Sequence, residues 1–380
     1  MGGPLPVLSV GLNGHLLSGA ASYRSAGVHQ YILHLLRHLP EAGCRVTAFL
    51  GPSSPVEAGW EVRRSRLPTH RPLARILWEQ AFQPAALRQT GVDLAHGPAF
   101  VAPLAAPCPT VVTVHDLSFL RFPHLFRPAN RLYLRLFTRA SVRRARQVIA
   151  VSAHAADETI RLLGADPHKV HVVYHGVDPL FRPLPPDEVA AWREARGLPE
   201  RLMLAVGTLE PRKNLPRLIE AFANLRRPDL TLALVGGRGW YEQEIFTCVE
   251  RLGVKGQVIF PGYVANEELL WWYNAATVFA YPSLYEGFGL PVLEAQACGT
   301  PVLTADSSAL PEAAGDGALL VDPYRVEAIA EGLRRLLDDE GLREQMRQRG
   351  LAHAARFNWQ HAAAETVAVY HQALSEDRGA

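Results

Sequence analysis

The sequence predicts an α/β protein with two doubly wound, parallel-sheet domains. The chain has 380 residues, 48% of them hydrophobic, which suits two domains of about 150–200 residues better than one core. Short runs rich in Val, Ile and Leu alternate with helical stretches in both halves, as in sheets built from βαβ units. A proline-rich stretch, residues 175–188, separates the two halves.

The expected elements follow from hydrophobic periodicity. In the first half, we expect strands at 7–11, 44–50, 92–95, 110–114, 147–151 and 170–174, and helices at 26–39, 129–145 and 153–163. In the second half, we expect strands at 202–206, 230–235, 257–260, 277–281, 301–303 and 318–321, and helices at 214–225, 239–252, 266–275 and 290–298. Three helical patterns close the chain at 325–338, 341–355 and 360–375.

The proline-rich stretch sets the expected domain boundary. Because prolines interrupt helices and strands alike, residues 175–188 are interpreted as a linker between an N-terminal domain, 1–178, and a C-terminal domain, 179–359. Two such domains are expected to face each other across a cleft, with ligands at the carboxyl ends of their strands.

Composition excludes several classes of protein. A net charge of +2 argues against bulk binding of nucleic acid, which needs a concentrated basic face. The four cysteines, Cys44, Cys108, Cys248 and Cys298, lie far apart and are expected to be buried thiols in a reducing compartment. The N-terminus lacks the basic segment of a secretory signal, and no apolar run reaches the roughly 18 residues of a membrane span. We therefore expect a cytoplasmic protein.

The stretch 281–299, YPSLYEGFGLPVLEAQACG, carries the strongest functional signal. A strand is expected to end near its start, a turn follows with Gly287 and Gly289, and a short helix begins near Pro291 and ends before Gly299. Backbone N–H groups at the start of a helix, together with the helix dipole, favour phosphate binding. The turn and helix start therefore predict an anion site.

Two carboxylates, Glu286 and Glu294, flank this predicted anion site. A carboxylate accepts hydrogen bonds from sugar or ribose hydroxyls. The alternative is an ordinary strand-to-helix turn with two surface glutamates.

A second motif, GTLEPRKNL at 207–215, brings Arg212 and Lys213 between a strand and a helix. Two cations near a helix start can hold a diphosphate. The alternative is a solvated basic pair. Arginine far outnumbers lysine in this chain, whose only lysines are Lys169, Lys213 and Lys255, and this bias favours a function for Lys213.

Two weaker candidates lie in the first half. His115 ends an apolar strand in TVHDLSFL, where active-site loops begin, although a lone histidine is more often structural. Gly27 precedes an amphipathic helix, where glycine permits close approach of a ligand to the backbone.

Several common motifs are missing from the sequence. There is no P-loop, no G-x-G-x-x-G after the first strand and no G-x-S-x-G. No D-x-D triplet offers ligands for a metal that holds a diphosphate. We therefore expect neither a metal nor a cofactor, and we expect cations and helix ends to hold phosphates.

Taken together, these segments resemble glycosyltransferase family 4, retaining enzymes with the GT-B fold of two Rossmann-like domains. Glu286 and Glu294 match the E-x7-E motif of that family, within EGFGLPVLEAQACGTPV. GTLEPRKN, FPGYV (260–264), HGVD and FNW (357–359) fit as well. The resemblance covers essentially the whole chain and is greatest for bacterial mannosyltransferase-like members that build surface polysaccharides.

The resemblance implies a metal-independent hexosyltransferase. Its donor would be a nucleotide sugar, with mannose as a candidate hexose, and its acceptor would be a saccharide or a lipid-linked saccharide. Neither nucleic acid nor a cofactor is implied. The N-terminal domain, 1–178, would bind the acceptor, and the C-terminal domain, 179–359, would bind the nucleotide sugar. The helix at about 360–380 would pack back on the N-terminal domain.

The resemblance also implies roles for individual positions. Glu286 would contact the hydroxyls of the donor sugar, Glu294 the ribose, Lys213 the phosphates and His115 the sugar. The diphosphate would meet the glycine-bearing loop at Gly27. Backbone groups would bind the sugar and diphosphate at Gly287, Phe288, Gly289 and Leu290, and the nucleobase at Tyr263 and Val264.

One position departs from the family pattern. Many members carry an arginine directly after the glycine of the strand-end motif, whereas here Gly207 is followed by Thr208. Arg212 is a candidate for the missing charge.

Two alternative functions remain open from the sequence. A sugar-nucleotide 2-epimerase would use carboxylates as acid and base and would need no acceptor. A non-catalytic sugar-nucleotide binder would have less need of a cation at the leaving group.

Membrane contact is a further hypothesis. Residues 60–90 mix arginines with apolar side chains, and residues 119–146 combine Phe119, Phe122 and Phe126 with eight arginines. Such a surface could rest on the inner face of an anionic membrane. The alternative is that the aromatic side chains are core and the arginines are solvated.

Overall fold

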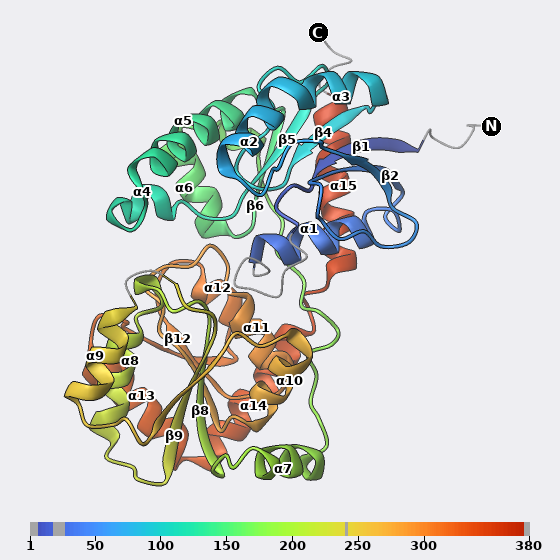
Figure 1. Cartoon of the computed structure of the whole chain (residues 1–380). Helices are drawn as coiled ribbons and strands as arrows, with labels where there is room; N and C mark the ends of the chain where they lie inside the picture. The colour runs from blue at the N-terminus through green and yellow to red at the C-terminus, as the bar shows by residue number, and fades with distance from the viewer. Residues whose placement is uncertain (1–6, 18–26, 240–241, 376–380) are drawn as a thin grey trace. The chain divides into compact units, whose positions relative to one another are not determined.

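The computed structural model describes residues 7–17, 27–239 and 242–375. Within this part, the chain divides into two compact units. The N-terminal unit runs to Gly176 and resumes at Trp359, and the C-terminal unit covers Val177–Asn358. Each unit contains one sheet with parallel strand pairing and helices packed against it, which confirms the predicted fold class (Figure 1).

The sheet of the N-terminal unit has the strand order β3-β2-β1-β4-β5-β6-β7. Its strands are β1 (Leu8–Asn13), β2 (Cys44–Leu50), β3 (Glu61–Arg64), β4 (Leu94–Gly97), β5 (Thr110–Val114), β6 (Gln147–Ala150) and β7 (Val170–Val172). Its helices are α1 (Gly27–His38), α2 (Pro72–Leu77), α3 (Gln83–Thr90), α4 (Ser118–Arg121), α5 (Pro128–Arg144), α6 (Ala153–Leu163) and α15 (Trp359–Ser375). A π-helical turn, Trp78–Phe82, joins α2 to α3.

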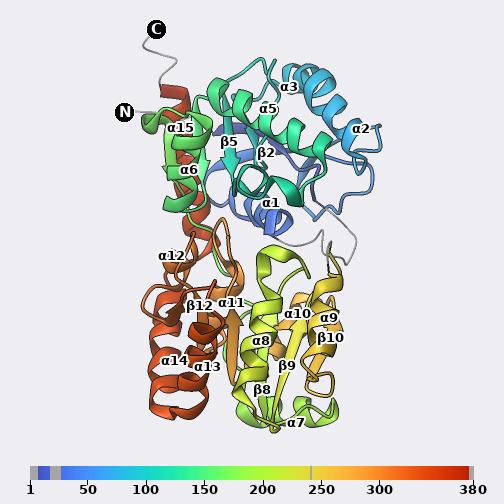
Figure 2. The same cartoon turned by 90° about the vertical axis from the view of Figure 1, so that its left-hand side faces the viewer.

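Both faces of this sheet are buried, which explains the continuous apolar runs in its strands. In β5, Val111 packs with residues of α1 and α15 on one face. Its neighbours Val112 and Val114 pack with residues of α5 and α6 on the other face. Helices α2, α3 and α5 lie together on the second face (Figures 1 and 2).

Helix α15 completes the core of the N-terminal unit. Its first residue, Trp359, stacks on His34 of α1 with ring centroids 4.5 Å apart. Further along, the Tyr370 hydroxyl lies 2.7 Å from His96 Nδ1 of β4. The last helix of the chain is therefore part of the first sheet's packing.

The sheet of the C-terminal unit has the order β10-β9-β8-β11-β12-β13. Its strands are β8 (Arg201–Val206), β9 (Leu230–Val235), β10 (Val258–Gly262), β11 (Val278–Tyr281), β12 (Val302–Ala305) and β13 (Ala318–Val321). Its helices are α7 (Pro186–Ala195), α8 (Leu215–Leu225), α9 (Gln243–Arg251), α10 (Asn266–Ala275), α11 (Leu290–Ala297), α12 (Leu310–Ala314), α13 (Val326–Asp338) and α14 (Glu340–Ala354).

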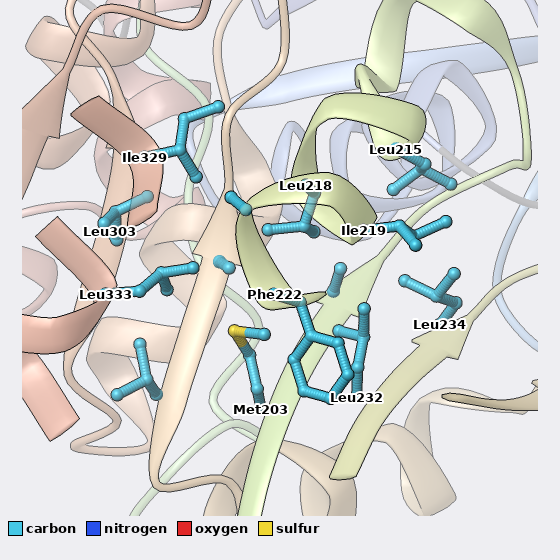
Figure 3. Packing of buried hydrophobic residues seen from close by; sticks show 14 of the residues in the cluster. Met203, Leu215, Leu218, Ile219, Phe222, Leu232, Leu234, Leu303, Ile329 and Leu333 are labelled. Atoms are coloured by element: carbon cyan, nitrogen blue, oxygen red, sulfur yellow. The ribbon is translucent and has the colours of Figure 1, made fainter. Parts of the chain in front are cut away.

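Helices cover both faces of this second sheet. Helices α8, α9 and α13 lie on one face, and α10, α11 and α14 lie on the other (Figure 1). Figure 3 shows the core of the first of these faces, where Leu218 and Phe222 of α8 meet Met203 of β8 and Leu333 of α13. This core fixes the position of α8 and therefore of the loop that precedes it.

The structure corrects the expected linker. Residues 173–185 contain no helix or strand, but α7 begins at Pro186, inside the stretch interpreted as linker. Proline has no backbone N–H group, but the N–H groups of the first turn have no partner within the helix. Proline can therefore start a helix without losing a hydrogen bond. The prolines at 185 and 186 therefore mark a helix start and not a continued linker.

Other differences concern weakly apolar segments. Strand β3 was not predicted, because its sequence EVRR has no apolar alternation and it lies at the sheet edge. Helices α2 and α3, in the region interpreted only as basic and aromatic, were also missed. Position 26 and positions 240–241 of two expected helices lie outside the described residues.

Three of the four cysteines are buried, as the sequence predicts, and Cys108 is the exception. Cys44, Cys248 and Cys298 are buried, Cys108 is half-buried, and all four are free thiols. Of the helices that the structure describes, none combines the length and apolar character needed to cross a bilayer.

Candidate active site

The candidate site lies at the centre of the C-terminal sheet. Strands β8 and β11 are neighbours there, and the strand order runs outward from them in opposite directions. In open parallel sheets, ligands bind beyond the carboxyl ends of the strands at such a switch point. The loops that follow these two strands carry Lys213 and Glu286, so the topology brings both predicted motifs to one edge.

The lysine and the first glutamate are in direct contact. The Lys213 ammonium lies 2.7 Å from Glu286 Oε1 and also donates a hydrogen bond to the Tyr281 hydroxyl. The same hydroxyl donates to Glu286 Oε1 over 3.0 Å. These three side chains form a triad between the ends of β8 and β11.

The triad keeps both of its ionisable partners charged. Burial favours the neutral forms of Lys213 and Glu286. Opposing interactions together outweigh burial: Glu286 and then Tyr281 raise the pKa of Lys213 above its ordinary value. Lys213 and then Arg212, together with hydrogen bonds to the carboxylate, lower the pKa of Glu286. A fixed cation is therefore present at this edge at neutral pH.

Asn214 holds the lysine loop against the loop after β11. Its backbone adopts a left-handed conformation with φ of 59°. Its buried side-chain amide donates to the carbonyls of Pro282 at 3.0 Å and Pro323 at 2.7 Å. In addition, the Leu284 N–H donates to the carbonyl of Arg212. Both loops are thus fixed relative to each other before any ligand binds.

Arg212 has a carboxylate partner of its own. Its guanidinium lies 2.6 Å from Glu210 Oε1, and Glu210 is buried. A second guanidinium nitrogen donates to the carbonyl of Tyr285 at 3.4 Å. Arg212 therefore links the two loops, and much of its charge is balanced by Glu210 before any ligand binds.

Helix α11 begins at the same edge. Its capping residue, Gly289, has φ of 124°, a conformation that side-chain-bearing residues rarely adopt. Leu290 is the first helical residue, and the first-turn N–H groups of a helix have no partner within it. Gly287 lies in the turn between Glu286 and this helix. The buried ring of Phe288 packs 6.0 Å from that of Phe357, so only its backbone is available for the predicted role.

Glu294 lies one turn into α11 and is bound to a tyrosine. The Tyr273 hydroxyl donates to Glu294 Oε2 at 2.8 Å. Burial raises the pKa of Glu294 to about 7, against the opposing effect of this hydrogen bond. The carboxyl group consequently changes its protonation near neutral pH.

The loop at Gly207 runs beside the loop after β9. The Gly207 N–H donates to the carbonyl of Val235, and a Cβ at Gly236 would lie 1.9 Å from the Gly207 carbonyl oxygen. Glycine at 236 therefore permits this close approach. Thr208, the position that departs from the pattern expected from the family resemblance, is half-buried in the same loop.

Tyr263 and Val264 follow β10, at the same carboxyl edge of the sheet. Tyr263 is exposed and Val264 is half-buried. A contact of their backbone with a nucleobase stays a prediction.

Two predicted residues belong to the N-terminal unit. Gly27 is the first residue of α1, not the residue before it, and no atom of the described residues lies within 4 Å of the position of an added Cβ. His115 follows β5 and is buried, and its Nε2–H donates to the carbonyl of Pro98 at 2.7 Å. Burial lowers the pKa of His115, which favours the neutral imidazole.

Sequence reasoning missed Tyr281, Tyr273, Asn214 and Glu210. Tyr281, Tyr273 and Glu210 each bond to a predicted residue, and Asn214 fixes the loop that carries Lys213. Three of the four, Tyr281, Asn214 and Glu210, lie in the quoted motifs. Asn214 follows Lys213 directly, and asparagine tolerates the left-handed conformation that it adopts here. Glu210 is a carboxylate two positions before Arg212.

Residues 188–353 match the family described as "Glycosyl transferases group 1", and residues 25–180 match "Glycosyltransferase Family 4". An O-antigen chain mannosyltransferase B of Escherichia coli is 35% identical over 290 residues, which cover 75% of this chain and 76% of that protein. The chain belongs to glycosyltransferase family 4. This family membership makes it an enzyme that transfers a glycosyl group.

Other relatives span more of this glycosyltransferase. A D-inositol 3-phosphate glycosyltransferase 1 of Catenulispora acidiphila is 32% identical over 93% of both chains. A sucrose-phosphate synthase structure from Thermosynechococcus elongatus covers 97% of this chain and 100% of its own, with a TM-score of 0.81 and 24% identity. The Anabaena protein HepE in complex with UDP-glucose covers 95% and 99%, with a TM-score of 0.74 and 23% identity. These structures have the GT-B fold in common with this glycosyltransferase.

Proposed function

We propose that this glycosyltransferase moves a hexose, with mannose as our candidate, from a nucleoside-diphosphate sugar to a hydroxyl of a saccharide or lipid-linked acceptor. The observation that carries the proposal is the Lys213 ammonium fixed 2.7 Å from Glu286 Oε1 at the switch point of the C-terminal sheet. Mannose and a place in cell-surface polysaccharide synthesis are supported by the printed function of the Escherichia coli relative.

In the proposed reaction, the bond between the anomeric carbon and the diphosphate oxygen breaks while the acceptor oxygen bonds to the same face of that carbon. Negative charge grows on the leaving diphosphate, and Lys213 together with the N-terminus of α11 would stabilise it. The acceptor proton passes to the departing diphosphate. Glu286 would bind the hydroxyls of the sugar, and Glu294 those of the ribose. Retention rests on the family resemblance.

Metal independence is part of the same proposal. Lys213 supplies positive charge where a metal ion would otherwise be needed. Activity should survive treatment with EDTA, and a strict requirement for added Mg²⁺ or Mn²⁺ would contradict this part of the proposal.

The experiment begins with a thermal-shift panel of GDP, UDP and ADP and the corresponding hexose nucleotides, because a tight ligand raises the melting temperature. The best donor is then incubated with and without saccharide acceptors, and products are identified by NMR. Retention predicts the same anomeric configuration in donor and product. A new sugar nucleotide formed from the donor alone would instead identify an epimerase.

Lys213→Ala should lower kcat by about 10²-fold or more, the usual scale for removing one stabiliser of transition-state charge. Lys255→Ala is the matched control, because Lys255 is an exposed lysine of the same unit. Equal turnover by the two variants would contradict the role of Lys213.

We also propose that the N-terminal unit contacts an anionic membrane surface. Leu73 of α2 is 82% exposed, and Leu132 and Leu136 of α5 are 57% and 55% exposed. Helix α5 contains no acidic residue and exposes Arg131 and Arg135, which precede Leu132 and Leu136 in the sequence. Apolar side chains beside arginines suit the interface of a membrane that contains anionic lipids.

The aromatic part of this hypothesis needs correction, because Phe119 is buried in the core and only 2% exposed. The test is sedimentation with phosphatidylglycerol or phosphatidylcholine vesicles. Arg131→Glu combined with Arg135→Glu should reduce binding to phosphatidylglycerol, whereas Arg349→Glu on α14 should not. Equal binding to both kinds of vesicle would contradict the proposal.

A further inference from the structure

An open pocket of about 1220 Å³ lies within the N-terminal unit. Its walls come from the loops after β1, β2 and β3, from the starts of α1 and α5, and from α2. Strand β1 is next to β4 in the sheet, and the strand order runs outward from this pair, so the pocket lies at the carboxyl end of a switch-point strand. This is the position where ligands are expected in an open parallel sheet.

A buried histidine lines the pocket next to β1. His15 is 6% exposed, and its Nδ1 lies 2.9 Å from Thr69 Oγ1. Its ring lies 4.1 Å, centroid to centroid, from that of Trp78. The other ring nitrogen, Nε2, is also buried and has no hydrogen-bond partner among the described residues.

A buried polar atom without a partner is uncommon and costs free energy, so it calls for an explanation. Burial and the nearby charge of Arg75 lower the pKa of His15 to about 3, so the imidazole is neutral at neutral pH. In either tautomer, Nε2 then offers one donor or one acceptor to a hydroxyl of a bound molecule.

A second buried group holds this histidine and the wall of the pocket in place. Glu79, in the π-helical turn, accepts hydrogen bonds from Asn13 Nδ2 at 3.1 Å and from the Tyr133 hydroxyl at 3.2 Å. Arg75 Nε lies 3.8 Å from Glu79 Oε1. In turn, Asn13 Oδ1 accepts from the backbone N–H of His15. Single π-helical turns occur frequently at functional sites.

The charge of the pocket wall indicates the kind of ligand. Arg75 and Arg127 both line the pocket, and its described lining contains no Asp or Glu. Glu79 balances part of the Arg75 charge, whereas Arg127 is exposed at the start of α5. Apolar side chains such as Leu16 and Ile76 also line the pocket and suit the C–H faces of a sugar ring. The lining therefore combines a net positive charge with a neutral hydrogen-bonding group.

We propose that this pocket binds the acceptor, and that the acceptor is an anionic saccharide. A carboxylate or phosphate of the acceptor would lie at Arg127 and Arg75, and one of its hydroxyls would bond to His15 Nε2. This inference rests on the proposed transferase function, which requires an acceptor, and it adds the chemical class of that acceptor.

The test compares the binding of four probes to the full-length protein by calorimetry or NMR titration. The probes are methyl α-mannoside, mannose 6-phosphate, glucuronic acid and farnesyl phosphate in detergent. At least one of the two anionic sugars should bind ten-fold or more tightly than methyl α-mannoside. Preference for the phosphate or for the carboxylate identifies the anion. Binding of farnesyl phosphate alone, or equal binding of neutral and anionic sugars, would overturn the proposal.

Variants test the assigned residues separately. Arg127→Gln should weaken binding of the preferred anionic sugar about ten-fold and leave methyl α-mannoside unaffected. Arg88→Gln, an exposed arginine of α3 outside the pocket, is the matched control. His15→Gln should weaken binding of both classes of sugar. Native-like binding of the anionic sugar by Arg127→Gln would refute the assignment.

Nucleotide binding separates this inference from the proposed function. The pocket variants should keep the thermal shift with the best nucleoside diphosphate, because they lie in the other unit. If that shift occurs but no anionic sugar shows the expected preference, the inference fails and the transferase proposal stands. If anionic sugars bind and no nucleotide does, the proposed function fails.

Discussion

The buried ion pair of the candidate site allows a test of stability that needs no substrate. Lys213 and Glu286 are only 13% and 12% exposed, and their charged atoms lie 2.7 Å apart. Glu286→Gln removes one charge and leaves the Lys213 ammonium buried without its partner. This should lower the free energy of unfolding by about 3 kcal/mol, the lower end of the range for breaking a buried ion pair. In a unit of this size, that loss corresponds to a fall in melting temperature of roughly 6–12 °C.

The assay is thermal unfolding followed by circular dichroism, with three variants beside the native chain. Glu344→Gln is the matched control, because Glu344 also lies 2.7 Å from an arginine, Arg347, but on the exposed surface of the same unit. It should leave the melting temperature unchanged. Lys213→Met combined with Glu286→Gln should recover most of the loss, since neither charge remains. If Glu286→Gln and Glu344→Gln have the same melting temperature, the ion pair between Lys213 and Glu286 does not stabilise the fold.

Three further predictions concern other parts of the molecule. Burial lowers the pKa of His96 to about 3, so the unfolded chain binds more protons below pH 6.5, and stability falls as the pH decreases. When the pH is lowered from 7.5 to 5.5, the free energy of unfolding should fall by about 1.4 kcal/mol less in His96→Gln than in the native chain. Urea titrations at the two pH values measure this, and an equal fall in both proteins would contradict it. Because the pKa of Glu294 is about 7, affinity for a nucleoside diphosphate should fall by up to roughly ten-fold from pH 8 to pH 6. Calorimetry should show a smaller change in Glu294→Gln, and the same change in both would remove the carboxylate from ribose binding. Gly289→Ala should lower the free energy of unfolding by about 1–3 kcal/mol, because φ is 124° and the new Cβ would lie 3.1 Å from that of Ala313. Gly256→Ala is the control: the space around Gly256 is open, so this variant should keep the native melting temperature.

Strands were well predicted where burial on both faces makes them apolar throughout. Strands β5 and β8 could be predicted from their own apolar sequences, without knowing which strands lie beside them. Strand β3 escaped because an edge strand can be polar, and its position depends on β2 rather than on its own sequence. Pro186 was misread because proline interrupts a helix internally but can also start one.

The candidate site was only partly visible in the sequence. The pairing of Lys213 with Glu286 followed from two motifs after strands of one sheet, although the adjacency of β8 and β11 is a property of strand order that periodicity does not reveal. Tyr281 could not be singled out from the sequence. It is the last residue of an apolar strand, and nothing in such a strand indicates that its hydroxyl bonds to both Lys213 and Glu286. The pocket at His15 was missed for a similar reason, since its walls come from segments distant in sequence.

The position of α15 affects the order in which the protein can fold during synthesis. Trp359 and Tyr370 belong to the core of the N-terminal unit, yet they leave the ribosome after the whole of Val177–Asn358. At ordinary translation rates, the intervening segment takes roughly 10–40 s to make. The C-terminal unit is continuous in sequence and can finish first, while the first sheet waits with one face incompletely covered. A nascent chain stalled after Asn358 would therefore expose apolar surface of β1 and α1 to chaperones.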